Sequence, residues 1–291
     1  MAANSFNDFV HYPDLPIGIC CFTTRPSAFI FFAYSITNIL LLLPLCILVL
    51  YLGLQRWRRH RSTSAAATTS HSDSFAYHMV AMQLIGVFGH TLCCCGIYGD
   101  HVNLFIVRFS LWNIPWYGEI LFHILTCVER YLAVVHPVTY LSLRRERGIR
   151  IRNISIGCVW LLCFGATVVT FETVFSIIDF SLLSFSLFFI SFCSLSVLCV
   201  LIRPGPGEKG GDRERVDQSK QRAFCTIMAI LVVLLLTYSG NLVGLCLSVL
   251  SKDDECVLVM SLFWFNIPSS LVLPLLFLHR AGTLVCRKNN T

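Results

Sequence analysis

The chain has 291 residues, of which 56% are hydrophobic and only 13% are charged, and its net charge is +6. A soluble domain has about 25% charged residues, so this composition and the mean hydropathy of +0.71 exclude a water-soluble fold for most of the chain. The basic residues form short clusters without interleaved aromatic residues, which argues against nucleic-acid binding and for orientation in a lipid bilayer.

Long apolar runs follow one another along the chain. A helix needs about 20 apolar residues to cross a membrane, and a helix satisfies all its backbone groups within one segment. Residues 1–27 lack the apolar core of a signal peptide and are interpreted as an extracellular segment. The sequence predicts an all-α, seven-transmembrane helix bundle over 28–278, with spans at 28–54, 75–98, 103–135, 153–174, 177–202, 223–250 and 257–278.

Lys and Arg are concentrated in the connections after the first, third, fifth and seventh spans, whereas the alternate connections hold only Arg25 and Lys252. By the positive-inside rule, the N-terminus is extracellular and the C-terminus cytoplasmic. Residues 203–222 are interpreted as a flexible cytoplasmic loop because of their Pro and Gly residues. Residues 279–291 are interpreted as a short amphipathic helix and tail, with Cys286 as a palmitoylation candidate.

The third span carries a polar and aromatic stripe. At steps of three or four residues, it presents on one face Trp112, Trp116, Glu119, His123, Thr126 and Arg130. Charged groups at membrane depth are placed toward the protein interior because exposure to lipid is costly. This span is therefore expected to stand centrally in the bundle. Packing between helices is an alternative explanation for the two tryptophans.

At the end of this span, Glu129-Arg130-Tyr131 is followed by His136-Pro137-Val138. This arrangement resembles the end of helix three in rhodopsin-like G-protein-coupled receptors. The run Ser269-Ser270-Leu271-Val272-Leu273-Pro274-Leu275-Leu276-Phe277 resembles the Asn-Pro-x-x-Tyr ending of helix seven in that family, with Leu273 and Phe277 in place of the Asn and the Tyr. The resemblance implies that Glu129 holds Arg130 at rest, that Arg130 becomes available to a heterotrimeric G protein when the bundle opens, and that Val138 docks into that partner.

The sequence departs from this family in three places. The usual cysteine near Phe105 is absent, so Cys20 or Cys21 is proposed to pair with Cys256, with free or lipid-modified thiols as the alternative. Helix six has Gly240 but no kinking proline, so a receptor-like protein that no longer signals stays an alternative. The family's buried acid on helix two is replaced by Gln83, which leads to the hypothesis that a sodium ion or a proton is bound by Gln83, Glu119 and Ser270.

A ligand pocket for a small molecule or peptide is expected among the outer halves of helices two, three, six and seven. Its candidate residues are His90, Arg108, Trp112, Asn113, Trp116, Asn241, Phe263 and Asn266. No acid stands at Trp112, which argues against an amine ligand, and Arg108 could either receive an anionic group or reach toward the lipid headgroups.

Besides a receptor of the plasma membrane, the sequence bears on two other classes of protein, an enzyme and a channel or transporter. The chain shows no Gly-rich phosphate loop, nucleophile motif or metal-binding histidine cluster, so an enzyme is not expected. The absence of an internal repeat argues against inverted-repeat transporters. A channel or another kind of transporter remains the alternative from a different class.

Overall fold

The computed structural model describes residues 25–62, 71–99, 102–143, 146–169, 174–202, 213–250 and 256–289, and all of them except His136 are helical. In chain order the helices are α2 (Arg25–Ser62), α3 (His71–Gly99), α4 (Val102–Val135), α5 (Pro137–Leu143), α6 (Glu146–Val169), α7 (Val174–Ile202), α8 (Arg213–Leu250), α9 (Cys256–Leu262), the 3-10 helix η2 (Phe263–Phe265) and α10 (Asn266–Asn289).

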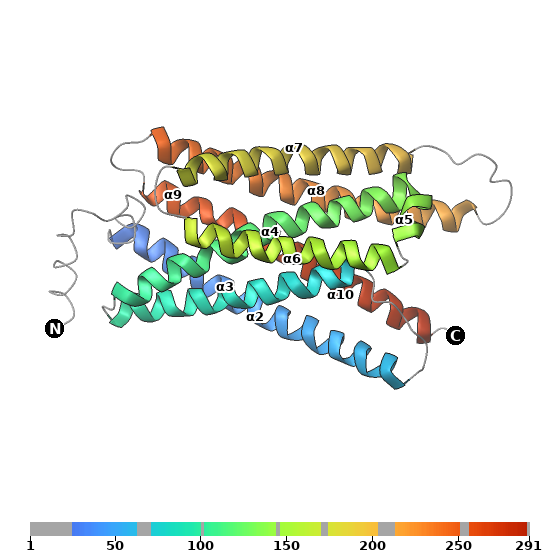
Figure 1. Ribbon diagram of the computed structural model, residues 1–291, viewed down its shortest axis with the longest axis horizontal. Coiled ribbons are helices and arrows are strands. Elements are labelled where there is room, and N and C mark those ends of the chain that lie inside the picture. Colours follow the sequence, from blue (N-terminus) through green and yellow to red (C-terminus); the bar gives the residue numbers. More distant parts are fainter. Residues whose placement is uncertain are drawn as a thin grey trace.

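The long helices lie side by side along one axis (Figure 1). The beginnings of α2 and α4 lie at the same end of the bundle as α9, and this end is called the α9 end. The end of α4 lies with the short helix α5 at the other end, which is called the α5 end. The first residues of α2 and the last residues of α10 lie at opposite ends. Helix α4 packs against α3, α6, α7 and α10, and this central position places its polar stripe among its neighbours.

Six of the described helical segments are long and apolar enough to cross a membrane: Pro26–Arg58, Asp73–Cys95, Glu146–Ala166, Ile177–Val200, Ile230–Leu247 and Cys256–His279. Large apolar side chains cover the outside of the bundle, among them Phe29, Leu161 and Phe188, which are 72–74% exposed. Such a surface is stable against lipid chains and not against water. The chain is therefore a multi-pass membrane protein.

Helix α4 is not among these six segments, although it is 34 residues long. We attribute this to the polar residues of its stripe, including Glu119 and His123, which lower the hydropathy of the helix. Its other faces are apolar. Phe122 of α4 is buried in one core cluster with Met82 of α3 and Cys163 of α6, and Ile120 of α4 packs in another with Leu183 of α7 and Leu234 of α8. The polar face is thus enclosed by protein.

Several elements differ from the sequence-based expectation, and α8 and α10 are two of them. Helix α8 begins at Arg213, inside the segment 203–222 that was interpreted as a loop. The charged residues of 213–222 suggested a loop, but Arg, Lys, Gln and Glu are also good helix formers. The short helix expected after residue 278 is continuous with α10, which runs to Asn289.

Candidate functional site

The buried carboxyl group of Glu119 is held by two serines of α10. Ser270 Oγ donates a hydrogen bond to Glu119 Oε2 at 2.7 Å, and Ser269 Oγ donates to Glu119 Oε1. Both serine hydroxyls also lie 3.0 Å from the backbone carbonyl of Asn266. Side chains at successive positions of a helix point in different directions, so Ser269 and Ser270 donate hydrogen bonds to the two different oxygens of the carboxyl group.

His123 lies one helical turn after Glu119 on the same face of α4. Its Nε2 atom is 3.2 Å from the backbone carbonyl of Ser269 and 4.0 Å from Glu119 Oε1. A carbonyl can only accept a hydrogen bond, so a neutral His123 carries its proton on Nε2. The imidazole is 1% exposed, which keeps it away from bulk solvent.

Gln83 connects α3 to the part of α10 that holds Glu119. Its Nε2 atom donates to the backbone carbonyl of Ser270 at 2.5 Å, and its Oε1 atom accepts a long contact of 3.7 Å from the thiol of Cys46 on α2. The structure thus brings together Gln83, Glu119 and Ser270, the three residues that the sequence suggested as an ion or proton site. Ser269 and His123 were not included in that suggestion.

A cavity of about 40 Å³ adjoins Glu119 on the side of the α9 end, and it is called the Glu119 cavity. Its polar lining includes Tyr34, Asn38, Gln83, His90, Asn266 and Ser270. A cavity needs roughly 10–15 Å³ to hold one water molecule, so this space suits water or a small ion. The carboxylate of Glu119 and the neutral oxygens of Asn38 and Ser270 are ligands that hard cations accept.

The residues suggested for a ligand pocket are distributed over this region. His90, Trp116 and Asn266 line the Glu119 cavity, and Asn241 donates a hydrogen bond to Asn266 Oδ1 at 2.7 Å. Phe263 packs instead against the rings of Phe31 and Tyr34 at the α9 end. Asn113 is buried but does not line this cavity. The side chains of Arg108 and Trp112 lie outside the described residues.

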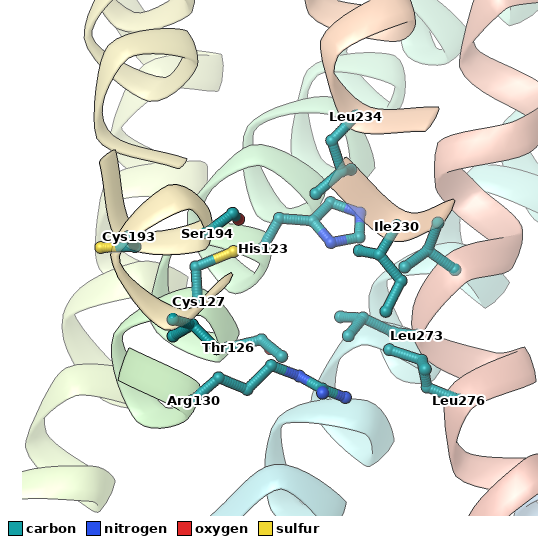
Figure 2. Close-up of a pocket in the computed structure, with 12 residues that line it drawn as sticks. His123, Thr126, Cys127, Arg130, Cys193, Ser194, Ile230, Leu234, Leu273 and Leu276 are labelled. Carbon is teal, nitrogen blue, oxygen red and sulfur yellow. The ribbon is translucent and has the colours of Figure 1, made fainter. Parts of the chain in front are cut away.

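A second cavity, of about 20 Å³, lies closer to the α5 end and is called the Arg130 cavity. Figure 2 shows His123 and Arg130 of α4 pointing into it. Its lining also includes Cys193 and Ser194 of α7, Ile230 and Leu234 of α8, and Leu273 and Leu276 of α10. The guanidinium group of Arg130 therefore lies where four helices converge.

The neighbours of Arg130 in sequence are tied to α5. Glu129 Oε1 accepts a hydrogen bond from the hydroxyl of Tyr140 at 3.3 Å, and the hydroxyl of Tyr131 lies 3.4 Å from His136 Nε2. Pro137 begins α5, and Val138, the next residue, is 81% exposed. The suggested contact by which Glu129 holds Arg130 stays a prediction.

The helix-seven residues lie in the core of the bundle. Pro274 is inside α10, and Phe277 is buried, with its ring edge-on to Tyr77 at 5.3 Å. The guanidinium of Arg56 lies 4.9 Å from the centre of the Phe277 ring and forms an ion pair with Asp73 at 3.3 Å. These contacts tie the ends of α2, α3 and α10 together.

One buried polar pair, Tyr117 and Asp179, was not predicted from the sequence. The hydroxyl of Tyr117 donates a 2.7 Å hydrogen bond to Asp179 Oδ1, which joins α4 to α7. Asp179 lies at the start of the predicted span 177–202, where no partner was predicted for it, yet it is 6% exposed. An acid among apolar residues near the start of a span is a signal for such a pair.

Only one of the cysteines for which a role was predicted, Cys256, has a described side chain. Cys256, at the start of α9, is disulfide-bonded, whereas Cys20 and Cys21 lie outside the described residues. Their pairing with Cys256 stays a prediction. The side chain of Cys286 also lies outside the described residues.

Comparison with known proteins adds no family to this description. No protein-family model matches the chain, and no curated protein matches it.

Proposed function

We propose that the protein is a seven-helix receptor of the plasma membrane, similar to rhodopsin-like G-protein-coupled receptors, that passes an extracellular signal to a heterotrimeric G protein at the α5 end. The observation that carries this proposal is the position of Arg130. Its side chain enters a cavity between α4, α7, α8 and α10, so separation of these helices would expose a guanidinium group to a partner.

The α5 end also offers an apolar contact. Val138 and Leu141 of α5 are 81% and 62% exposed, beside Arg147 and Arg150, which are exposed on the first turns of α6. Apolar side chains rimmed by charges are typical of a protein–protein contact. This surface supports the suggested docking role of Val138.

Signal input is proposed at the α9 end. His90, Trp116 and Asn266 line the Glu119 cavity, and Asn241 is bonded to Asn266. A ligand that displaced this end of α8 relative to α10 would alter the contacts of Asn266, whose backbone carbonyl is next to Ser269 and Ser270. Sodium bound beside Glu119 would stabilise one arrangement of these helices, as the family resemblance implies.

Nucleotide exchange on purified G proteins tests the proposal without a ligand. The full-length protein in lipid nanodiscs is expected to accelerate exchange on at least one G-protein type. Arg130→Ala should lower that acceleration about tenfold or more, because hydrogen bonds to a charged group contribute about 1.5–3 kcal/mol. The matched control is Arg58→Ala, which removes an exposed arginine of α2.

Equal amounts of folded protein are required in each sample, as judged by elution from a sizing column. Acceleration that survives Arg130→Ala would contradict the role of Arg130. Ion flux in liposomes together with no exchange on any G protein would favour a channel or transporter.

A further inference from the structure

The Glu119 cavity and the Arg130 cavity are separated by one turn of α4. Glu119 lines the first and His123 lines the second, and Glu119 Oε1 and His123 Nε2 are 4.0 Å apart. Ser269 contacts both groups, through its hydroxyl to Glu119 and its backbone carbonyl to His123. A titratable pair thus stands between two spaces of the size of water molecules.

The hydrogen bonds around Glu119 can be satisfied whether or not the carboxyl group holds a proton. Each serine hydroxyl has one hydrogen and two acceptors within reach, Glu119 and the carbonyl of Asn266. With Glu119 ionised, both hydroxyls donate to it. With Glu119 protonated, its O–H donates to one serine, which turns its own hydrogen to Asn266. Neither state leaves a buried polar group unsatisfied.

His123 has the chemistry to receive a proton on one nitrogen and release another from the second. The carbonyl of Ser269 keeps the hydrogen of the neutral ring on Nε2, so Nδ1 is the basic atom. Protonation at Nδ1 gives an imidazolium, and loss of the Nε2 hydrogen restores a neutral ring. The atom that releases the proton is the one that lies nearest to Glu119.

One hydrogen-bond donor beside the Glu119 cavity, Asn266 Nδ2, needs an acceptor. Asn266 Nδ2 is buried and has no hydrogen-bond acceptor among the described residues, while Asn266 lines the cavity. Buried polar groups of this kind are ordinarily bonded to water. Water here would connect Glu119 to His90, whose Nδ1 is 3.1 Å from Ser35 Oγ.

We propose that Glu119 and His123 form a proton relay through the centre of the bundle, which gives the protein a proton permeability beyond any receptor activity. A proton from water in the Arg130 cavity bonds to His123 Nδ1. The Nε2–H bond then breaks and its proton bonds to Glu119, leaving a neutral ring and a carboxylic acid. Glu119 releases this proton to water in the Glu119 cavity, and rotation of the neutral ring about its side-chain bonds turns its N–H toward Ser269 and its bare nitrogen toward the Arg130 cavity, so that the next proton can bind.

The transfer between His123 and Glu119 needs a shorter approach than 4.0 Å. Hydrogen-bonded pairs of nitrogen and oxygen atoms lie about 2.7–3.2 Å apart, so a side-chain movement of roughly 1 Å is sufficient. Among the residues that the structure describes, the other ionisable groups that line the two cavities or lie beside Glu119 are Tyr34, His90, Cys127, Arg130, Cys193 and Tyr238.

Arg130 is the fixed cation on this path, and a cation that lines a narrow passage repels protons. The relay is therefore expected to be slow while Arg130 occupies its cavity and faster without its charge. This gives Arg130→Gln as a variant that should raise proton flux, in contrast to variants of the relay itself.

Proton flux into liposomes tests the relay. The full-length protein is reconstituted in liposomes that enclose a pH-sensitive dye, and a potassium gradient with valinomycin sets the membrane potential. We expect wild-type flux above the leak of protein-free liposomes, and higher flux with Arg130→Gln. Glu119→Gln and His123→Gln keep polar atoms for the neighbouring groups but cannot carry a proton, so each should return flux to the leak rate in both backgrounds.

Asp179→Asn is the matched control, since Asp179 is also a buried acid but lines neither cavity. Flux at the leak rate with both wild type and Arg130→Gln would overturn the relay, as would equal losses with Asp179→Asn and Glu119→Gln. Nucleotide exchange on G protein, measured with the same preparations, reports on the proposed receptor function separately.

Discussion

Glu119 and Asp179 show how single buried acids are accommodated in this protein. Glu119 is surrounded by two serines, a histidine and a cavity, whereas Asp179 accepts its hydrogen bond from the hydroxyl of Tyr117. An uncompensated charge at membrane depth costs several kcal/mol. The first acid has partners suited to proton exchange, and the second is suited to a structural role.

The Tyr117–Asp179 bond should therefore contribute to stability. Tyr117→Phe keeps the ring that packs edge-on against Trp116 but removes the donor to Asp179. Loss of one partner of a buried hydrogen bond costs about 1–3 kcal/mol, so we expect a lower melting temperature in detergent. Tyr51→Phe removes only an exposed hydrogen bond that the Tyr51 hydroxyl accepts from Gln55 on α2, so its effect on the melting temperature should be smaller. An unchanged melting temperature for Tyr117→Phe would refute the structural role.

Residue-level prediction succeeded where a local pattern was sufficient. The steps of three and four residues from Glu119 to His123 and Arg130 follow from helix geometry, and the structure does place all three side chains on the inner face of α4. Ser270 was named only through the family resemblance and Ser269 was missed, because both hydroxyls reach Glu119 across at least 150 positions of sequence. No local spacing contains that information.

At the scale of elements, the junction of α5 and α6 depends on one glycine. A Cβ atom on Gly148 would lie 1.7 Å from the carbonyl oxygen of Leu143, the last residue of α5. Because that atom belongs to the backbone, it cannot move aside as a flexible side chain would. Gly148 thus permits α5, with its exposed Val138, to lie against the first turn of α6.

Substitution at this junction should displace α5. We expect Gly148→Ala to destabilise the protein by about 1–3 kcal/mol, the usual cost of overpacking, and to slow nucleotide exchange on G protein. Gly157→Ala is the control, since a Cβ there meets nothing within 4 Å and alanine favours the helix by up to about 1 kcal/mol. Thermal unfolding in detergent measures both. Equal stability of the two variants would show that the junction can adjust.

Two helices extend beyond the apolar runs by which hydropathy identifies them. Apolar run length identifies the membrane-crossing portion of α8, but the helix begins at Arg213 because charged residues can extend a helix beyond the bilayer. In the same way α10 continues to Asn289. Hydropathy marks the contact with lipid, and it does not mark where the backbone hydrogen bonds stop.

At the scale of the molecule, the arrangement in the membrane has a direct test. Helices α2 and α10 begin and end at opposite ends of the bundle (Figure 1), and the Lys and Arg residues favour a cytoplasmic α5 end. We expect an N-terminal epitope tag to be stained on intact cells and a C-terminal tag only after permeabilisation. Staining of both tags on intact cells would contradict the topology and the receptor function that depends on it.

The sequence by itself determined that this chain lies in a membrane as a helical bundle and that one helix carries a polar stripe. Both follow from local quantities, the length of apolar runs and the helical repeat. Only the tertiary structure decided that Ser269 and Ser270 hold Glu119, that Asp179 bonds to Tyr117, and that His123 stands between two cavities. These contacts depend on the rotation and register of packed helices, which interlocking side chains set across distant parts of the chain.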